Sequence, residues 1–273
     1  RRQEKNSERA SEYLQVGYEI FDRKDVIKSD TDVFCIIKKA LGDLPLRVAT
    51  GDIGILMTAV SSLKTTSSRQ KALLRHLWRP QRFLAILEKF TNEASLSTER
   101  FDGFQAEKSF ANQAKEIGLR RKSEIIERIE NLLQDSKEAP ISTTELEVIN
   151  SLLNIGDKCP QALIKLKDLL SDMPALGTAI EKFEKRLSAL DSANVDLSSI
   201  DFEVSYGRTS MEYYDGFVFG FYSENHINLP PIATGGRYDA LTKHIGKGRE
   251  IPAVGGVVRP DLIIQSKGFE DND

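Results

Sequence analysis

Two strand-rich ends separated by a long helical stretch are the feature that most limits the folds open to this chain. Residues 12–21 alternate between two faces at a period of two, which predicts a strand, and strand signals return from residue 198 onward. Between them, residues 67–197 carry apolar residues at helical spacing. We therefore expect an α+β protein with a mostly antiparallel sheet, in which residues 1–66 and 198–273 are two halves of one domain and residues 67–197 are a helical insertion.

Capping residues predict several helix boundaries. Three consecutive residues could cap a helix over residues 30–42: Asp30, Thr31 and Asp32. In the insertion, Ser142 and Glu145 have the spacing of a capping box, and Pro160 suits the first turn of a helix.

Composition and residue spacing exclude several function classes. The chain has 38 Lys and Arg against 41 Asp and Glu, a net charge of -3, so it lacks a whole-chain basic footprint for nucleic acid. Cys35 and Cys159 are far apart, and His76, His226 and His244 do not have ligand spacing, so we expect no metal site. No apolar window is long enough to span a membrane, and we expect no secretory signal at the start. A cytoplasmic protein is the expectation.

The richest aromatic run is Met211–Tyr222. Read as one strand, it places five residues on one face: Tyr214, Gly216, Val218, Gly220 and Tyr222. Glycines on such a face leave room for a ligand near the backbone, and a tyrosine hydroxyl can orient it. The same glycines can instead accommodate an overlying helix, so the run alone does not separate a binding site from a core strand.

Three other polar patterns are ambiguous by themselves. Gly235 and Gly236 precede Arg237, Tyr238 and Asp239, which can form a weak phosphate loop or a glycine-hinged turn with a local ion pair.

An arginine at the end of a strand, Arg259, can pair with phosphate or carboxylate, or remain solvated. Gln15 and Glu19 share a strand face about 13 Å apart. They could present an amide and a carboxylate to a small polar cation, or simply face solvent.

The order of these patterns resembles the catalytic domain of class II histidyl-tRNA synthetases. A Gln-x-Gly-x-Glu strand is followed by Tyr-Tyr, by Gly-Gly-Arg-Tyr-Asp and by Gly-Gly-x-x-Arg, over residues 1–62 and 198–265. The resemblance implies a class II synthetase-like sheet flanked by helices. It also implies a histidine site made of Gln15, Glu19, Tyr213, Tyr214 and Tyr238. Three arginines correspond to nucleotide-contacting arginines of the family: Arg1, Arg9 and Arg259.

Two departures point away from aminoacylation. Thr209 stands where the family's histidine motif has an arginine that neutralises charge during adenylate formation, and Arg208 is shifted by one residue. We also expect no anticodon-binding domain. The sequences of residues 207–221 and 233–241 look like those of another family with this anatomy, the synthetase-like regulatory subunits of ATP phosphoribosyltransferase.

This second resemblance implies a regulatory subunit that has no catalytic residue and no cofactor, with a vestigial nucleotide site. Its partners would be the short catalytic subunit, in a hetero-oligomer, and histidine as an allosteric ligand in histidine biosynthesis. The resemblance further implies that a segment with motif 1 precedes this sequence and that the full-length protein is a homodimer. It implies no tRNA partner and no membrane association. The alternatives are a fragment of a histidyl-tRNA synthetase core and a helical interaction module carried on a synthetase-like scaffold.

Overall fold

The computed structural model describes residues 13–92, 103, 121–135, 137–208 and 213–267. The chain divides into two compact units. One contains the residues up to Leu56 and from Leu152 onward, and the other runs from Met57 to Ser151.

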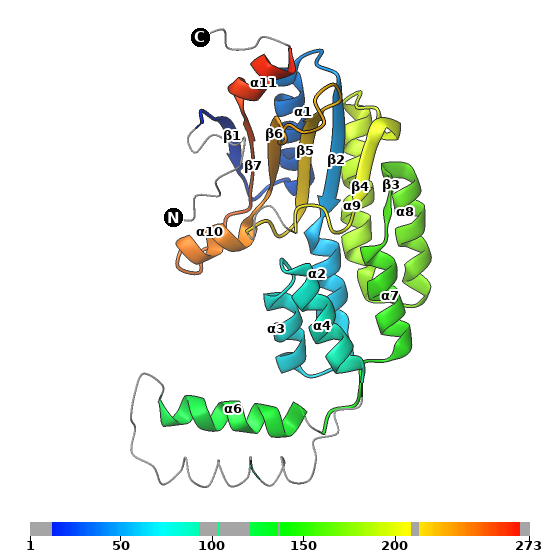
Figure 1. Cartoon of the computed structure of the whole chain (residues 1–273), viewed down its shortest axis with the longest axis vertical. Helices are drawn as coiled ribbons and strands as arrows, with labels where there is room; N and C mark the ends of the chain where they lie inside the picture. The colour runs from blue at the N-terminus through cyan, green and yellow to red at the C-terminus, as the bar shows by residue number, and fades with distance from the viewer. Residues whose placement is uncertain (1–12, 93–102, 104–120, 136, 209–212, 268–273) are drawn as a thin grey trace. The chain divides into compact units, whose positions relative to one another are not determined.

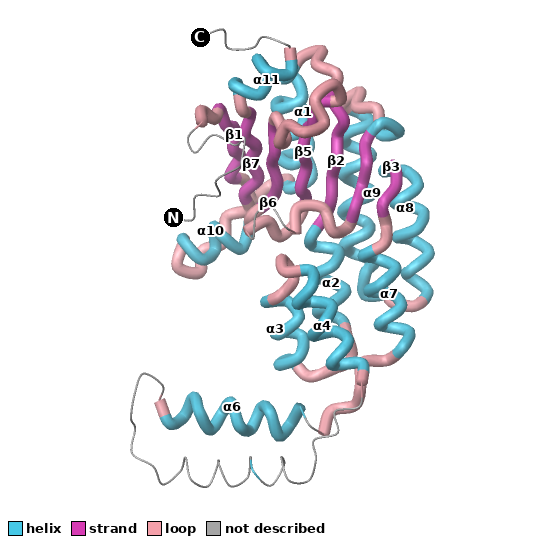
Figure 2. The backbone as a smooth tube through the Cα atoms, viewed as in Figure 1, coloured by secondary structure: helices cyan, strands magenta, loops and turns pink. Residues whose placement is uncertain are grey.

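A mixed, mostly antiparallel sheet forms the centre of the first unit (Figures 1 and 2). Its strands, in chain order, are β1 Val16–Phe21, β2 Leu46–Asp52, β3 Gly156–Lys158, β4 Ile200–Glu203, β5 Phe217–Ser223, β6 Ala233–Arg237 and β7 Ala253–Val258. Their spatial order is β1-β7-β6-β5-β2-β4-β3, and only β2 and β4 pair in parallel. The α+β expectation is confirmed.

The helices of this unit are α1 Val26–Leu41, α8 Cys159–Asp168, α9 Gly177–Ser192, α10 Asp239–Ile245 and α11 Pro260–Ser266. Three short 3-10 turns connect them: Leu169–Ser171, Pro174–Leu176 and Leu197–Ser199. In Figure 1, α1 and α9 lie behind the sheet, where they contact each other and α1 contacts β6 and β7. The ring of Phe34 on α1 packs between those of Phe219 and Phe221, each 5.3 Å away, in the core.

The first helix begins earlier than its sequence predicts. Asp25 is the N-cap, and its side chain accepts a hydrogen bond from the Lys28 amide at 2.9 Å. The prediction that Asp30, Thr31 or Asp32 caps this helix is wrong, because a buried ion pair holds Asp30 inside the helix. Pro160 does lie in the first turn of α8, as predicted.

Two strand predictions in the second half are also wrong. Strand β5 begins at Phe217, so Tyr213 and Tyr214 precede the strand rather than lie in it. Gly235 and Gly236 lie inside β6 and not in a turn. The local Arg237–Asp239 ion pair is present at 2.9 Å.

The second unit is helical. It contains most of α2 Ile53–Ser62 and α7 Thr143–Leu153, together with α3 Ser67–Arg75, α4 Pro80–Thr91 and α6 Lys122–Asp135. The Ser142–Glu145 capping box is confirmed, since the Glu145 amide donates to Ser142 Oγ and the Ser142 amide donates to the Glu145 carboxylate, each at 3.3 Å. Helices α8 and α9 belong to the first unit, while the domain boundaries at residues 66 and 197 stay predictions.

Candidate functional site

One face of the sheet is lined by glycines where strands β1, β7 and β6 meet. The antiparallel register aligns Glu19 with Gly255 and Gly255 with Gly236. A Cβ atom at Gly255 would lie 2.7 Å from Cγ of Glu19, and one at Gly236 would lie 2.7 Å from the Tyr214 ring. The side chains of Glu19 and Tyr214 therefore lie directly against the backbone, which only glycine permits.

Four of the five residues predicted to bind histidine come together on this face. The ring centroid of Tyr213 lies 4.6 Å from that of Tyr214 and 5.8 Å from that of Tyr238, the latter edge-on. Burial and, to a smaller extent, the nearby Glu19 carboxylate raise the pKa of both Tyr214 and Tyr238. Gln15 is exposed just before β1, and it forms no hydrogen bond with a residue that the structure describes.

Burial sets the protonation of this group. Tyr214 and Tyr238 are 5% and 8% exposed, and burial is the main reason that the pKa of each phenol is raised. Both are therefore neutral hydrogen-bond donors near pH 7. Tyr238 Oη is buried and faces the Glu19 carboxylate, which contributes to its raised pKa, and the hydroxyl retains hydrogen-bonding capacity for a ligand. A carboxylate beside two neutral phenols suits a small ligand with a cationic group and a polar ring.

The predicted nucleotide arginines are less clearly placed. The guanidinium of Arg259 lies 3.8 Å over the ring of Tyr13, and its Nη2 donates to Asp261 at 2.8 Å. Asp261 thus pairs with the charge of Arg259, and Tyr13 covers one face of its guanidinium. Arg1, Arg9 and Thr209 lie outside the described residues, so their predicted roles stay predictions. Arg208 lies in a turn after β4 and not on a strand face.

Sequence reasoning missed a cluster of buried charges behind the site. Asp30, Asp52, Arg186 and Arg237 are each 5% exposed or less. A usable signal existed, because Arg186 falls between Phe183 and Leu187 on the buried stripe of α9. A charge on an apolar stripe indicates a buried partner, since an unpaired buried charge is costly.

Asp215, next to Tyr214, connects two parts of the site. Its carboxylate accepts hydrogen bonds from the backbone amides of Asp239, at 3.0 Å, and Ala240 at the start of α10. Burial raises the pKa of Asp215 to about 6 despite these bonds. The residue therefore changes charge near neutral pH.

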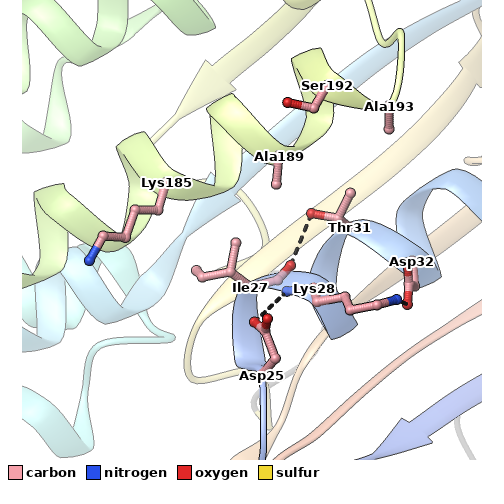
Figure 3. Close-up of a pocket in the computed structure, with 9 residues that line it drawn as sticks. All are labelled: Asp25, Ile27, Lys28, Thr31, Asp32, Lys185, Ala189, Ser192 and Ala193. Atoms are coloured by element: carbon pink, nitrogen blue, oxygen red, sulfur yellow. Dashed lines mark hydrogen bonds and ion pairs between the residues drawn. The ribbon is translucent and has the colours of Figure 1, made fainter.

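Away from this face, a hollow of about 610 Å³ lies between α1 and α9 (Figure 3). Its polar side chains already have partners within the chain. Lys28 pairs with Asp32, Lys185 pairs with Glu181 at 2.7 Å, and Ser192 Oγ donates to a helix carbonyl at 2.8 Å. The hollow therefore offers a ligand little hydrogen-bonding capacity.

Two kinds of feature are absent from the described residues. These residues contain no group of three or more His, Cys, Asp or Glu side chains that could hold a metal ion. Among the same residues, no helix is long and apolar enough to cross a membrane.

Comparison with known sequences gives one family and a consistent set of relatives. The family model described as histidyl-tRNA synthetase matches residues 1–263. The ATP phosphoribosyltransferase regulatory subunit of Agrobacterium fabrum is 27% identical, over 96% of this chain and 74% of that protein. The protein of the same name from Brucella ovis is 26% identical, over 90% of this chain and 70% of that protein.

Solved structures support the fold. An ATP phosphoribosyltransferase regulatory subunit/histidyl-tRNA synthetase from Bacillus halodurans gives a TM-score of 0.57 at 19% identity, covering 93% of this chain and 53% of that one. Histidyl-tRNA synthetase from Nostoc sp. PCC 7120 gives 0.56 at 14% identity, covering 94% and 51%. This chain thus spans about half the length of each. At these identities, the likeness shows the class II synthetase-like fold alone.

The Asp215→Asn variant tests the charge state of that carboxyl. Its folded pKa of about 6 is above the ordinary value of 3.8, so its contribution to the free energy of unfolding is full below about pH 4 and is lost as the pH rises through about 6. From about pH 4 to pH 7, we expect the free energy of unfolding of Asp215→Asn to rise relative to that of the unaltered chain by about 1–3 kcal/mol. Urea unfolding across this range measures it.

Asp196→Asn is the matched control. Asp196 is exposed, and the Ser198 hydroxyl lowers its pKa, so this variant should show no shift in that direction. Equal pH profiles for the two variants would contradict the assignment to Asp215.

Proposed function

The chain belongs to the histidyl-tRNA synthetase family, and we propose that within this family it is the regulatory subunit of ATP phosphoribosyltransferase, acting in histidine biosynthesis. The observation that carries the proposal is the name shared by the curated relatives, which align over 96% and 90% of this chain. The synthetase-like sheet with a binding face is what such a subunit would inherit.

The ligand proposed for the glycine-lined face is histidine. Glu19 can accept a charge-assisted hydrogen bond from the ammonium or imidazolium of histidine. The rings of Tyr213 and Tyr238 offer apolar surface beside it, and the Tyr238 hydroxyl has capacity for one more hydrogen bond. A ligand held at this corner would contact β1, the segment before β5 and the end of β6 together.

We propose that the subunit is not itself catalytic. In its sequence, Thr209 replaces the arginine that would stabilise charge during adenylate formation. In its structure, the Arg259 guanidinium is paired with Asp261 and covered on one face by Tyr13. The transferase chemistry would then belong to the short catalytic subunit, and histidine would act by favouring one state of the assembly.

An activity assay tests the function. We expect the short catalytic subunit to be activated by adding this chain, and histidine to reduce the activity of the mixture more than that of the catalytic subunit alone. Absence of activation would contradict the proposal. Histidine-dependent exchange of pyrophosphate into ATP by this chain alone would indicate a synthetase instead, and absence of heat on titrating histidine would favour a helical interaction module.

Glu19→Ala tests the carboxylate of the site. Losing one charge-assisted hydrogen bond should weaken histidine binding by about 1.5–3 kcal/mol, measured by calorimetry. Glu184→Ala is the control, because Glu184 is a half-exposed carboxylate that pairs with Lys167 on the surface. Unchanged affinity in Glu19→Ala would remove Glu19 from the binding site.

Tyr214→Phe tests the phenols. Removing one hydroxyl while keeping the ring should weaken histidine binding by about 0.5–1.5 kcal/mol and leave the fold intact. Tyr238→Ala should weaken it more, because ring packing is lost too. Tyr18→Phe is the control, since Tyr18 is one residue from Glu19 on the opposite face of β1 and is 42% exposed. Equal effects of Tyr18→Phe and Tyr214→Phe would place Tyr214 in the core rather than in the site.

A further inference from the structure

Behind the tyrosines, a chain of buried ion pairs joins four elements of the first unit. The Asp30 carboxylate on α1 accepts hydrogen bonds from Nε of Arg186 on α9 and from Nε of Arg237 on β6, both at 2.9 Å. Arg186 Nη1 donates to Asp52, at the end of β2, at 2.8 Å. Asp30 is fully buried and therefore holds both arginines in fixed positions.

Arg237 anchors both tyrosine segments. Its carbonyl accepts a hydrogen bond from the Asp215 amide at 3.0 Å, directly after Tyr214. Its side chain lies against Gly216, where a Cβ atom would be 3.2 Å from Cδ of Arg237. The position of Arg237 therefore determines where the segment with Tyr213 and Tyr214 lies.

Tyr238 is held from both sides. Arg237 Nη1 donates to the Asp239 carboxylate at 2.9 Å, so the two neighbours of Tyr238 are joined through their side chains. The Tyr238 amide donates to the Ala253 carbonyl at 2.9 Å, and the Ala253 amide donates back to Asp239 at 2.8 Å. Moving Arg237 would thus move the Tyr238 ring.

Arg186 is the far end of this chain of contacts. It lies on α9, and within the described part of the chain its hydrogen bonds and ring contact go to Asp30, Asp52 and Phe217 rather than to the four clustered site residues. Its guanidinium also lies 4.6 Å over the ring of Phe217, the first residue of β5, which follows Gly216. Arg186 therefore reaches the tyrosine segments by two routes, through Asp30 and Arg237 and through Phe217.

We propose that Arg186 is a positioning residue for the ligand site, acting through Asp30 and Arg237 on Tyr238 and on the Tyr213–Tyr214 segment. The identity of the ligand rests on the proposed function, whereas the placement of the tyrosines does not. An arginine that served stability alone would leave the tyrosines where they are in every variant that still folds.

The test uses the full chain with Arg186→Met and Asp52→Asn combined. The pair removes one positive and one negative charge, and an asparagine at position 52 can still accept the hydrogen bond that the Gly54 amide donates at 2.9 Å. The control combines Arg69→Met with Asp135→Asn in the other unit, where Arg69 is 2% exposed and also pairs with an aspartate. Both variants lose a buried arginine pair, and only the first lies on the route to Tyr238.

The first readout needs no ligand. The chain contains 7 tyrosines, so 3-fluorotyrosine labelling gives few fluorine resonances, and Tyr238→Phe identifies that of Tyr238. We expect the Tyr238 resonance to shift or broaden in the Arg186 variant and to remain in place in the Arg69 variant. The second readout is the Kd for histidine. We expect it to rise at least about fivefold in the Arg186 variant and to stay unchanged in the Arg69 variant, because only Arg186 is coupled to the site.

An unmoved Tyr238 resonance in the folded Arg186 variant would overturn the proposal, as would an equal change in the control. If the double variant does not fold, Arg186→Lys decides in the same way, because one ammonium cannot reproduce the two-pronged contact with Asp30 and Asp52. If the unaltered chain gives no heat with histidine, the proposed function fails, while the resonance still decides the role of Arg186.

Discussion

The bridge that Asp30 makes between two arginines constrains the rest of the first unit. A fully buried carboxylate is tolerated only with partners, and Asp30 has Arg186 on one oxygen and Arg237 on the other. Removing one partner of such a pair typically costs about 3–5 kcal/mol, because the remaining charge stays buried. The helices α1 and α9 and the strands β2 and β6 must therefore meet in one register, and the sheet face that carries the site is built on that register.

Different side chains cover the two faces of the sheet, which explains where the candidate site lies. On the helix side, Phe34 and Phe219 occupy the space, and a Cβ atom at Gly256 would lie 2.9 Å from Ile37. On the other face, Tyr206 covers Gly220 and hydrogen bonds to Tyr222 at 2.8 Å, so the end near β2 is filled by the chain itself. The proposed ligand site is therefore at the other end of this face, where Glu19 lies against Gly255.

Features that depend on neighbouring residues could be predicted from the sequence, whereas side-chain contacts between distant segments could not. The capping box at Ser142 and the helix start at Pro160 depend on neighbours in the chain, and both were predicted correctly. The order of motifs identified Glu19, Tyr213, Tyr214 and Tyr238, although their roles as ligands remain proposals. The predicted strand through Tyr214 is wrong because the Asp215 carboxylate accepts a hydrogen bond at the start of α10. The predicted cap at Asp30 is wrong because its side chain pairs with arginines 156 and 207 residues away, which no local pattern indicates.

Because the proposed site is made of separate segments, ligand binding there would be thermodynamically linked to the buried ion pairs. A ligand that contacts Glu19 on β1, the segment before β5 and Tyr238 after β6 binds best when those segments are already in place. In the proposed arrangement, the ion pairs would hold Arg237, and with it both tyrosine segments, in place before the ligand binds. By linkage, the ligand must in turn stabilise the same arrangement, by RT ln(1 + [L]/Kd). Any partner that contacts α1 or α9 and prefers one arrangement of Asp30 and Arg186 would therefore change the affinity of the tyrosine site, and the ligand would change the partner's affinity by the same factor.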